Sequence, residues 1–172
     1  LLNPEKYLNH LNSQGIEFIS GVPDSLLKDF CECVSQEYSP DKHIIASNEG
    51  AAVGLAIGYH LGTNKVPMIY LQNSGFGNII NPLLSLASKE VYGIPMLILV
   101  GWRGEPGIKD EPQHIHQGRV MTELIKSMDL SYFILDKDEN SAFAQSEKAI
   151  ALAKNTNSPV FILVKKNTFE KK

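Results

Sequence analysis

Strand-like and helix-like segments alternate along the whole chain. Six short runs are almost continuously apolar, as is typical of strands buried on both faces of a sheet, and they lie at 16–20, 43–46, 66–71, 96–100, 132–135 and 160–164. Polar or amphipathic segments of helical length separate them. This order predicts an α/β protein with three layers, α/β/α, in which helices cover both faces of a six-stranded parallel sheet through right-handed crossovers.

Local signals mark where the helices begin. Asn3 is suited to cap a helix whose first residue is Pro4, and Asp24 is placed to cap a second helix that continues to about residue 36. The remaining helices are expected to end near 62, 89, 128 and 154. No internal repeat or low-complexity segment interrupts this pattern, so we expect a single domain.

The stretch from 47 to 62 combines one acid with a helix of small and apolar residues. Glu49 is the only charged residue in it, and glycine recurs at 50, 54 and 58. Each glycine weakens a helix by about 1 kcal/mol relative to alanine, so we expect a buried helix that a ligand or another chain approaches closely. For Glu49 we expect a contest between the helix dipole, which favours its charge, and a dry environment, which opposes it. The plainer alternative is a glutamate that only helps to cap a core helix.

Unusual polar residues gather after the predicted strands. In an open parallel sheet, ligands bind beyond the carboxyl ends of the strands, and the segments there are 21–25, 47–49, 72–78 and 101–118. The last is the longest polar interval, and we expect it to be a functional, mobile loop. It carries His114 and His116, which are candidates for proton transfer near neutral pH or else solvated or structural histidines.

Composition and charge exclude several classes of protein. With 172 residues, of which 43% are hydrophobic, the chain can bury one core, and its net charge of -3 predicts no nucleic-acid partner. No apolar run reaches the roughly 20 residues of a membrane span and no secretory pattern is present, so we predict a cytoplasmic protein without a membrane partner. Cys31 and Cys33 match neither a zinc site nor a redox pair. We therefore expect buried thiols and no metal site within the chain.

Four motifs, taken in order, resemble a known family. They are G-V-P-D-S after the first strand, N-E-G-A-A-V-G-L-A-I-G-Y after the second, L-Q-N-S-G-F-G-N after the third and D-E-P-Q-H after the fourth. Together they resemble the pyrimidine-binding (PYR) domain of thiamine-diphosphate-dependent decarboxylases. The resemblance implies the thiamine-diphosphate-binding fold, with 1–165 as the PYR domain and 166–172 as the start of a linker or tail. Within the family the sequence is most similar to members that convert 3-phosphonopyruvate to 2-phosphonoacetaldehyde and carbon dioxide, and members acting on sulfopyruvate are close behind.

The resemblance implies a catalytic role for Glu49. This residue falls on the family's glutamate, which hydrogen-bonds N1′ of the cofactor's aminopyrimidine and so activates the cofactor to attack a small 2-oxo acid. Pro23, Asn73 and Asn78 fall in the segments that contact the cofactor. His114 falls on the histidines that handle protons on the reacting substrate.

Further residues are implied at the substrate end of the site. Asp24 and Ser25 both lie where the family places an active-site polar residue, and the sequence leaves open which of them corresponds. Gln113, His116 and Arg103 are candidates to bind the substrate. A phosphonate or sulfonate tail calls for a fixed cation such as Arg103, whose alternative is a solvated surface position.

One departure from the family bears on partners. The family's G-D-G motif, which holds the diphosphate and Mg²⁺, is absent from the sequence. We therefore expect the chain to hold half a site. Thiamine diphosphate and Mg²⁺ would be held by a diphosphate-binding (PP) domain, in the same full-length chain or in a separate beta chain, within a homo-oligomer. The alternative is a non-catalytic relative that keeps the sheet for assembly, against which the presence of Glu49 and both histidines argues.

Overall fold

The sheet of this protein is parallel throughout. The computed structural model describes residues 1–171 and contains one six-stranded sheet in the order β2-β1-β3-β4-β6-β5. The strands are β1 (Ile19–Gly21), β2 (His43–Ile45), β3 (Met68–Gln72), β4 (Met96–Gly101), β5 (Ser131–Ile134) and β6 (Pro159–Val164). Each overlaps an apolar run of the sequence, so the predicted six-stranded parallel sheet is confirmed.

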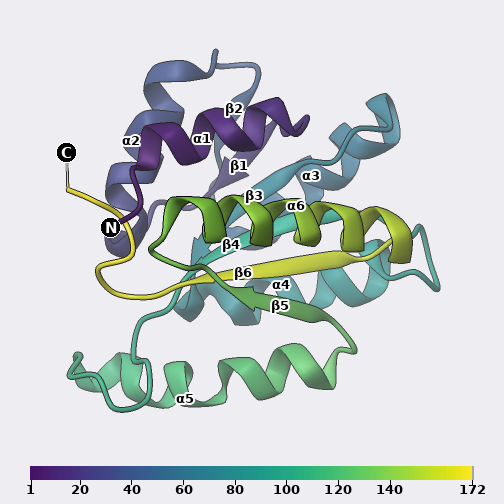
Figure 1. Ribbon diagram of the computed structural model, residues 1–172. Helices are drawn as coiled ribbons and strands as arrows, with labels where there is room; N and C mark the ends of the chain where they lie inside the picture. Colours follow the sequence, from purple (N-terminus) through teal and green to yellow (C-terminus); the bar gives the residue numbers. More distant parts are fainter. Residues whose placement is uncertain (172) are drawn as a thin grey trace.

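Helices cover both faces of the sheet (Figure 1). One layer contains α1 (Pro4–Ser13), α2 (Lys28–Glu37) and α6 (Glu139–Thr156), and the other contains α3 (Glu49–Thr63), α4 (Phe76–Pro82) and α5 (Pro112–Ser127). Alternate side chains of a strand point to opposite faces, so Met68 and Tyr70 pack in the first layer and Ile69 and Leu71 in the second. The four inner strands, β1, β3, β4 and β6, are apolar because both of their faces are buried. The edge strands β2 and β5 are only partly buried, so the expectation of burial on both faces is wrong for these two.

Helix starts follow the predicted capping chemistry. The Asn3 side chain accepts a hydrogen bond from the backbone N–H of Lys6, and α1 begins at Pro4. Asp24 also acts as a cap, accepting from the N–H of Leu26, but the element that it caps is a short 3₁₀ turn, Ser25–Leu27. α2 follows that turn, so the α-helix begins later than predicted.

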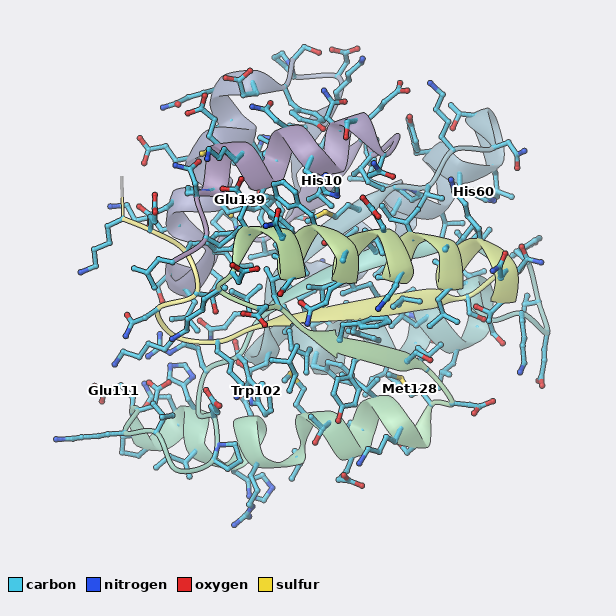
Figure 2. The ribbon with its side chains drawn as sticks, in the orientation of Figure 1. His10, His60, Trp102, Glu111, Met128 and Glu139 are labelled. Carbon is cyan, nitrogen blue, oxygen red and sulfur yellow. The ribbon has the colours of Figure 1, made fainter. Side chains whose placement is uncertain are left out.

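The connection between β4 and α5 is shorter than the predicted loop. α5 begins at Pro112, and proline is favoured at the first position of a helix. The prediction of an irregular loop is therefore wrong for 112–118. Trp102 fixes this helix against the sheet: its Nε1–H donates to the carbonyl of Gly118 at 2.9 Å. Figure 2 shows Trp102 between the sheet and α5. A Cβ on Gly118 would overlap the carbonyl oxygen of Gly104, and a Cβ on Gly104 would overlap that of His114, so neither position has room for a side chain.

The two ends of the described chain lie together (Figure 1). Leu2 pairs with Phe169 through a parallel bridge, and the Phe169 ring lies 5.8 Å from that of Tyr7 and 5.6 Å from that of Phe30. Packing with the domain therefore extends to Phe169, and the boundary after residue 165 stays a prediction. Cys31 and Cys33 are buried thiols, as expected. No helix within residues 1–171 has the length and apolar character needed to cross a membrane.

Candidate functional site

Four neighbouring strands end in the polar segments that the sequence singles out. In the order β2, β1, β3, β4, they lead into 46–49, 22–25, 73–78 and 102–111. Side-chain hydrogen bonds join these segments to one another, from Glu49 to the segment after β3 and from there to the segment after β4. The four segments therefore form one continuous edge of the molecule.

Glu49 is the first residue of α3 and turns toward the segment after β3. Asn48 caps the helix, accepting a hydrogen bond from the N–H of Ala51 at 2.9 Å. The half-buried Glu49 side chain accepts a hydrogen bond at Oε2 from Asn78 Nδ2, at 2.7 Å. It lies so close to Gly75 that a Cβ there would overlap the carboxylate. Within residues 1–171 no hydrogen bond is made to Oε1, so this oxygen can serve another partner.

The rest of α3 is buried on one face only, whereas the sequence predicted a buried helix. Its buried face consists of Ala52, Val53, Ala56 and Ile57. Of the glycines at 50, 54 and 58, only Gly50 makes a close approach among residues 1–171, because its Cβ would lie 2.8 Å from the carbonyl oxygen of Asn78. Gly54 and Gly58 are exposed, and a Cβ on either would meet nothing within 4 Å. They border an apolar hollow of about 760 Å³ between α3 and the edge strand β2.

Asp24 is a buried acid with one unsatisfied oxygen. Its side chain is only 5% exposed, and Oδ2 accepts a hydrogen bond from the N–H of Leu26 at 3.0 Å. Oδ1 is buried and has no hydrogen-bond partner in the described chain. Burial raises the pKa of Asp24 above its ordinary value, while the N–H of Leu26 and the nearby Arg103 partly oppose that rise. Asp24 is thus suited to hold a proton, and the adjacent Ser25 is exposed and not buried with it.

Arg103 is a fixed cation, so the alternative of a solvated surface arginine does not describe it. Its side chain is 20% exposed and forms an ion pair with Asp110. Its Nη1 donates to Ser25 Oγ at 3.0 Å, which brings two predicted substrate-binding residues together.

Asn73 is buried and holds the backbone of Arg103. Its Nδ2 donates to the carbonyl of Arg103, and its Oδ1 accepts a hydrogen bond from the N–H of Arg103. Asn73 therefore links the segments after β3 and β4, whereas sequence reasoning expected it to contact a cofactor.

The predicted histidines lie on a helix and face different surroundings. His114 is half-buried in the first turn of α5, and its Nδ1 is buried without a hydrogen-bond partner in the described chain. His116 is exposed, with Nδ1 2.9 Å from Nη2 of Arg119. Gln113 is also exposed. The structure thus gives His114 a more enclosed position than the other two candidates.

The remaining predictions concern the rim of the site and metal binding. Pro23 and Asn78 are exposed at the carboxyl edge. Within residues 1–171 no group of three or more His, Cys, Asp or Glu side chains could hold a metal ion.

Asp110, which binds Arg103, was not predicted from the sequence. An aspartate in a polar loop is common, and only the short D-E-P-Q-H motif that it begins could have drawn attention to it.

The sequence is similar to thiamine-dependent enzymes. It matches a family model described as "Thiamine pyrophosphate enzyme, N-terminal TPP binding domain" over residues 6–129. It is 34% identical over 144 residues to a phosphonopyruvate decarboxylase of Streptomyces viridochromogenes, with 82% of this chain and 35% of that protein covered. It is 32% identical over 150 residues to the sulfopyruvate decarboxylase subunit alpha of Methanococcus maripaludis, with 87% of this chain and 86% of that subunit covered.

Solved structures support the same fold. A thiamine-diphosphate-dependent 4-hydroxybenzoylformate decarboxylase of Rhodococcus jostii RHA1 superposes with a TM-score of 0.70 at 20% identity, covering 98% of this chain and 31% of that one. A benzoylformate decarboxylase from Polynucleobacter necessarius gives a TM-score of 0.73 at 17% identity, covering 100% of this chain and 31% of that one. The chain spans about a third of the length of these enzymes and of the phosphonopyruvate decarboxylases that it matches.

Proposed function

The chain belongs to the thiamine pyrophosphate enzymes, in the family of their N-terminal TPP-binding domain, and from that membership we propose that it is the PYR half of a 2-oxo-acid decarboxylase. The reaction would convert a 2-oxo acid and a proton into an aldehyde and carbon dioxide. Thiamine diphosphate, when bound, supplies the thiazolium that accepts the electron pair released with carbon dioxide.

The geometry of Glu49 is the observation that carries this proposal. Its carboxylate is half-buried at the shared edge, with Oε2 held by Asn78 and Oε1 available. A carboxylate with one fixed and one available oxygen fits the N1′ nitrogen of an aminopyrimidine, with which it would share a proton. Gly75 leaves the space that this carboxylate occupies. Asp24 and His114 each keep a buried, unpaired polar atom, and we assign them to holding protons beside the reacting substrate.

We propose 3-phosphonopyruvate as the substrate, with 2-phosphonoacetaldehyde as the product. The proposal is supported by the similarity to phosphonopyruvate decarboxylases and by the fixed guanidinium of Arg103 beside Ser25. Sulfopyruvate is the second candidate, because the chain covers 86% of a sulfopyruvate decarboxylase subunit alpha. Arg103→Ala in the complete enzyme should reduce turnover of either anion-tailed substrate far more than turnover of pyruvate.

A partner is part of the proposal. We assign the diphosphate and Mg²⁺ to a PP domain, in the same full-length chain or in a beta chain. The G-D-G motif is absent from the sequence, and residues 1–171 hold no cluster of three or more His, Cys, Asp or Glu side chains. The assembly would be a homo-oligomer that completes the site at the carboxyl edge. The uncovered apolar face of α3, which begins at Glu49, is the surface of the described chain best suited to a partner.

The experiment is a comparison of Glu49→Gln with Glu139→Gln in the complete enzyme. Glu139 is also the first residue of a helix, but it lies on α6 and pairs with Lys6. We expect Glu49→Gln to lower decarboxylation by orders of magnitude while partner binding persists, because the amide cannot share a proton. Glu139→Gln should retain wild-type activity.

The outcomes separate the candidate functions. A wild-type enzyme that assembles but decarboxylates neither 3-phosphonopyruvate nor sulfopyruvate would support the assembly role instead. Full activity of Glu49→Gln would remove Glu49 from the chemistry. Relative kcat/KM for the two anion-tailed substrates decides between the two substrate candidates.

A further inference from the structure

The guanidinium of Arg103 is held by one carboxylate. Asp110 accepts hydrogen bonds from Nε of Arg103, at 2.8 Å, and from its Nη2. Two parallel bonds of this kind fix the plane of a guanidinium as well as its position, because the fork of donors matches the two carboxylate oxygens. Arg103 therefore has a defined orientation before any ligand arrives.

Asp110 is itself fixed by the backbone. Its Oδ2 accepts a hydrogen bond from the N–H of Gly104 at 2.8 Å, and its Oδ1 accepts one from the N–H of Glu111 at 2.8 Å. The pKa of Asp110 is held well below its ordinary value, chiefly by the hydrogen bonds from Arg103 and with help from these two N–H groups. The carboxylate is therefore charged near neutral pH.

Arg103 keeps donors for a ligand despite these contacts. A guanidinium has five N–H donors, and described residues engage three of them: Asp110 two and Ser25 one. The backbone of Arg103 is fixed separately, by Asn73. A hollow of about 210 Å³ adjoins the side chain, and its lining includes Leu26, Trp102, Arg103 and Asp110.

We infer that Asp110 is a positioning residue that holds Arg103 so that its remaining donors, together with the Ser25 hydroxyl, receive the anionic tail of the substrate. The inference rests on the proposed function and adds to it a residue that the family resemblance did not supply. In this proposal the role of Asp110 is indirect. It acts through Arg103, whose orientation it determines before binding.

Charge and orientation make opposite predictions for Asp110. Its negative charge offsets that of Arg103, so by charge alone its removal would strengthen the binding of an anionic tail. The two hydrogen bonds of Asp110 to the guanidinium fix the orientation of Arg103. If that orientation matters most, removal of the Asp110 carboxylate would weaken the binding of the anionic tail. Asparagine at 110 would keep the size but turn an N–H₂ group toward the guanidinium donors. Asp110→Asn therefore decides which effect dominates.

The first measurement is binding without turnover. Isothermal titration calorimetry reports binding directly and needs no chemical step. The complete enzyme is titrated with phosphonoacetate, an unreactive compound with the same tail. We expect Asp110→Asn to raise Kd about tenfold, which corresponds to about 1.4 kcal/mol. Glu111→Gln is the matched control, because it removes an exposed neighbouring charge and leaves the Arg103 bonds intact. Its Kd should stay within about twofold.

The second measurement is kinetic. In Asp110→Asn we expect KM for 3-phosphonopyruvate to rise about tenfold with little change in kcat, while kcat/KM for pyruvate changes less than about twofold. Asp110→Glu keeps the charge and displaces the carboxylate by one methylene. Asp110→Glu should raise KM for 3-phosphonopyruvate, but not for pyruvate, by less than Asp110→Asn does. It replaces Asp110→Asn in the experiment if that variant does not fold.

The results that would overturn the role of Asp110 differ from the result that would contradict the proposed function. Equal losses for both substrates would show that Asp110 only supports the loop, and tighter phosphonoacetate binding in Asp110→Asn would show that it masks Arg103; either result overturns the inference. A wild-type enzyme that binds phosphonoacetate but decarboxylates no 2-oxo acid would contradict the proposed function. In that case the phosphonoacetate titrations of Asp110→Asn and Glu111→Gln still decide the role of Asp110.

Discussion

Glu49 and Gly75 show how one residue makes room for another. The carboxylate lies where a side chain at 75 would have to be, so the glycine is required by contact and not by backbone conformation. The two residues lie far apart in the sequence and meet because β2 and β3 flank β1 in the sheet. Both belong to motifs that sequence analysis identified, but their contact was not predicted.

We predict that Gly75→Ala impairs function more than stability. The new methyl would displace the Glu49 side chain, which is flexible and can move, so the free energy of unfolding should change by less than about 1 kcal/mol. Decarboxylation by the complete enzyme should fall at least tenfold, because the acid loses its place. Gly77→Ala is the control, since a Cβ at 77 meets nothing within 4 Å. Equal activity of the two variants would show that the position of Glu49 is not critical.

At the scale of the element, α3 differs from what its composition indicates. A helix rich in glycine, alanine and leucine with one acid reads as fully buried, yet Leu61 is 60% exposed and Gly58 lies in open space. Its apolar pattern has no strong helical period, so the sequence could not say which face the chain itself covers. The segment 112–118, which carries His114 and His116, differs from its prediction in another way. It reads as a polar loop, but Pro112 begins a helix there.

The glycines of α3 provide a test at this scale. Gly54→Ala and Gly58→Ala should each stabilise the isolated chain by up to about 1 kcal/mol, because alanine favours a helix and no contact among residues 1–171 opposes its methyl group. The same changes should weaken assembly with the partner if this face is the docking surface. Gly50→Ala should destabilise the chain, since its Cβ would lie 2.8 Å from Asn78 O. Urea unfolding and partner titration measure the two effects, and a loss of stability in Gly54→Ala would contradict the exposed position.

At the scale of the whole molecule, residues 1–171 form a packed α/β/α unit, which we propose carries part of a site. Its sheet is covered on both faces and its described ends are packed together, so the fold has a core of its own. The candidate residues, in contrast, lie at one open edge, and several are exposed there. That combination is expected for a domain whose active site is completed by a second surface.

Isothermal titration tests this division. We predict that the isolated chain gives no tight, Mg²⁺-dependent binding of thiamine diphosphate, because the family's G-D-G motif is absent from the sequence and residues 1–171 hold no cluster of three or more His, Cys, Asp or Glu side chains. Addition of the PP domain or beta chain should restore binding, and Glu49→Gln should weaken the restored binding. Tight binding by the chain alone would contradict the half-site proposal.

The sequence by itself determined the features that depend on local pattern and chemistry. Continuous apolar runs predicted six parallel strands, although the two at the edges are only partly buried. Asn3 and Asp24 were correctly placed as caps, and Glu49 was correctly placed at the start of a helix at the carboxyl edge of the sheet. These features follow from side-chain period, capping preference and the geometry of parallel strands, all of which act over a few residues.

Only the tertiary structure decided which polar groups meet. The amide of Asn73 was expected at a cofactor but bonds to the backbone of Arg103, thirty residues away, and Asp110 was overlooked although it orients that arginine. Such pairings depend on strand order and on the path of the β4–α5 connection, and neither leaves a periodic trace in the sequence. Packing likewise decided that one face of α3 stays uncovered, because burial depends on which neighbours are present and not on the helix alone.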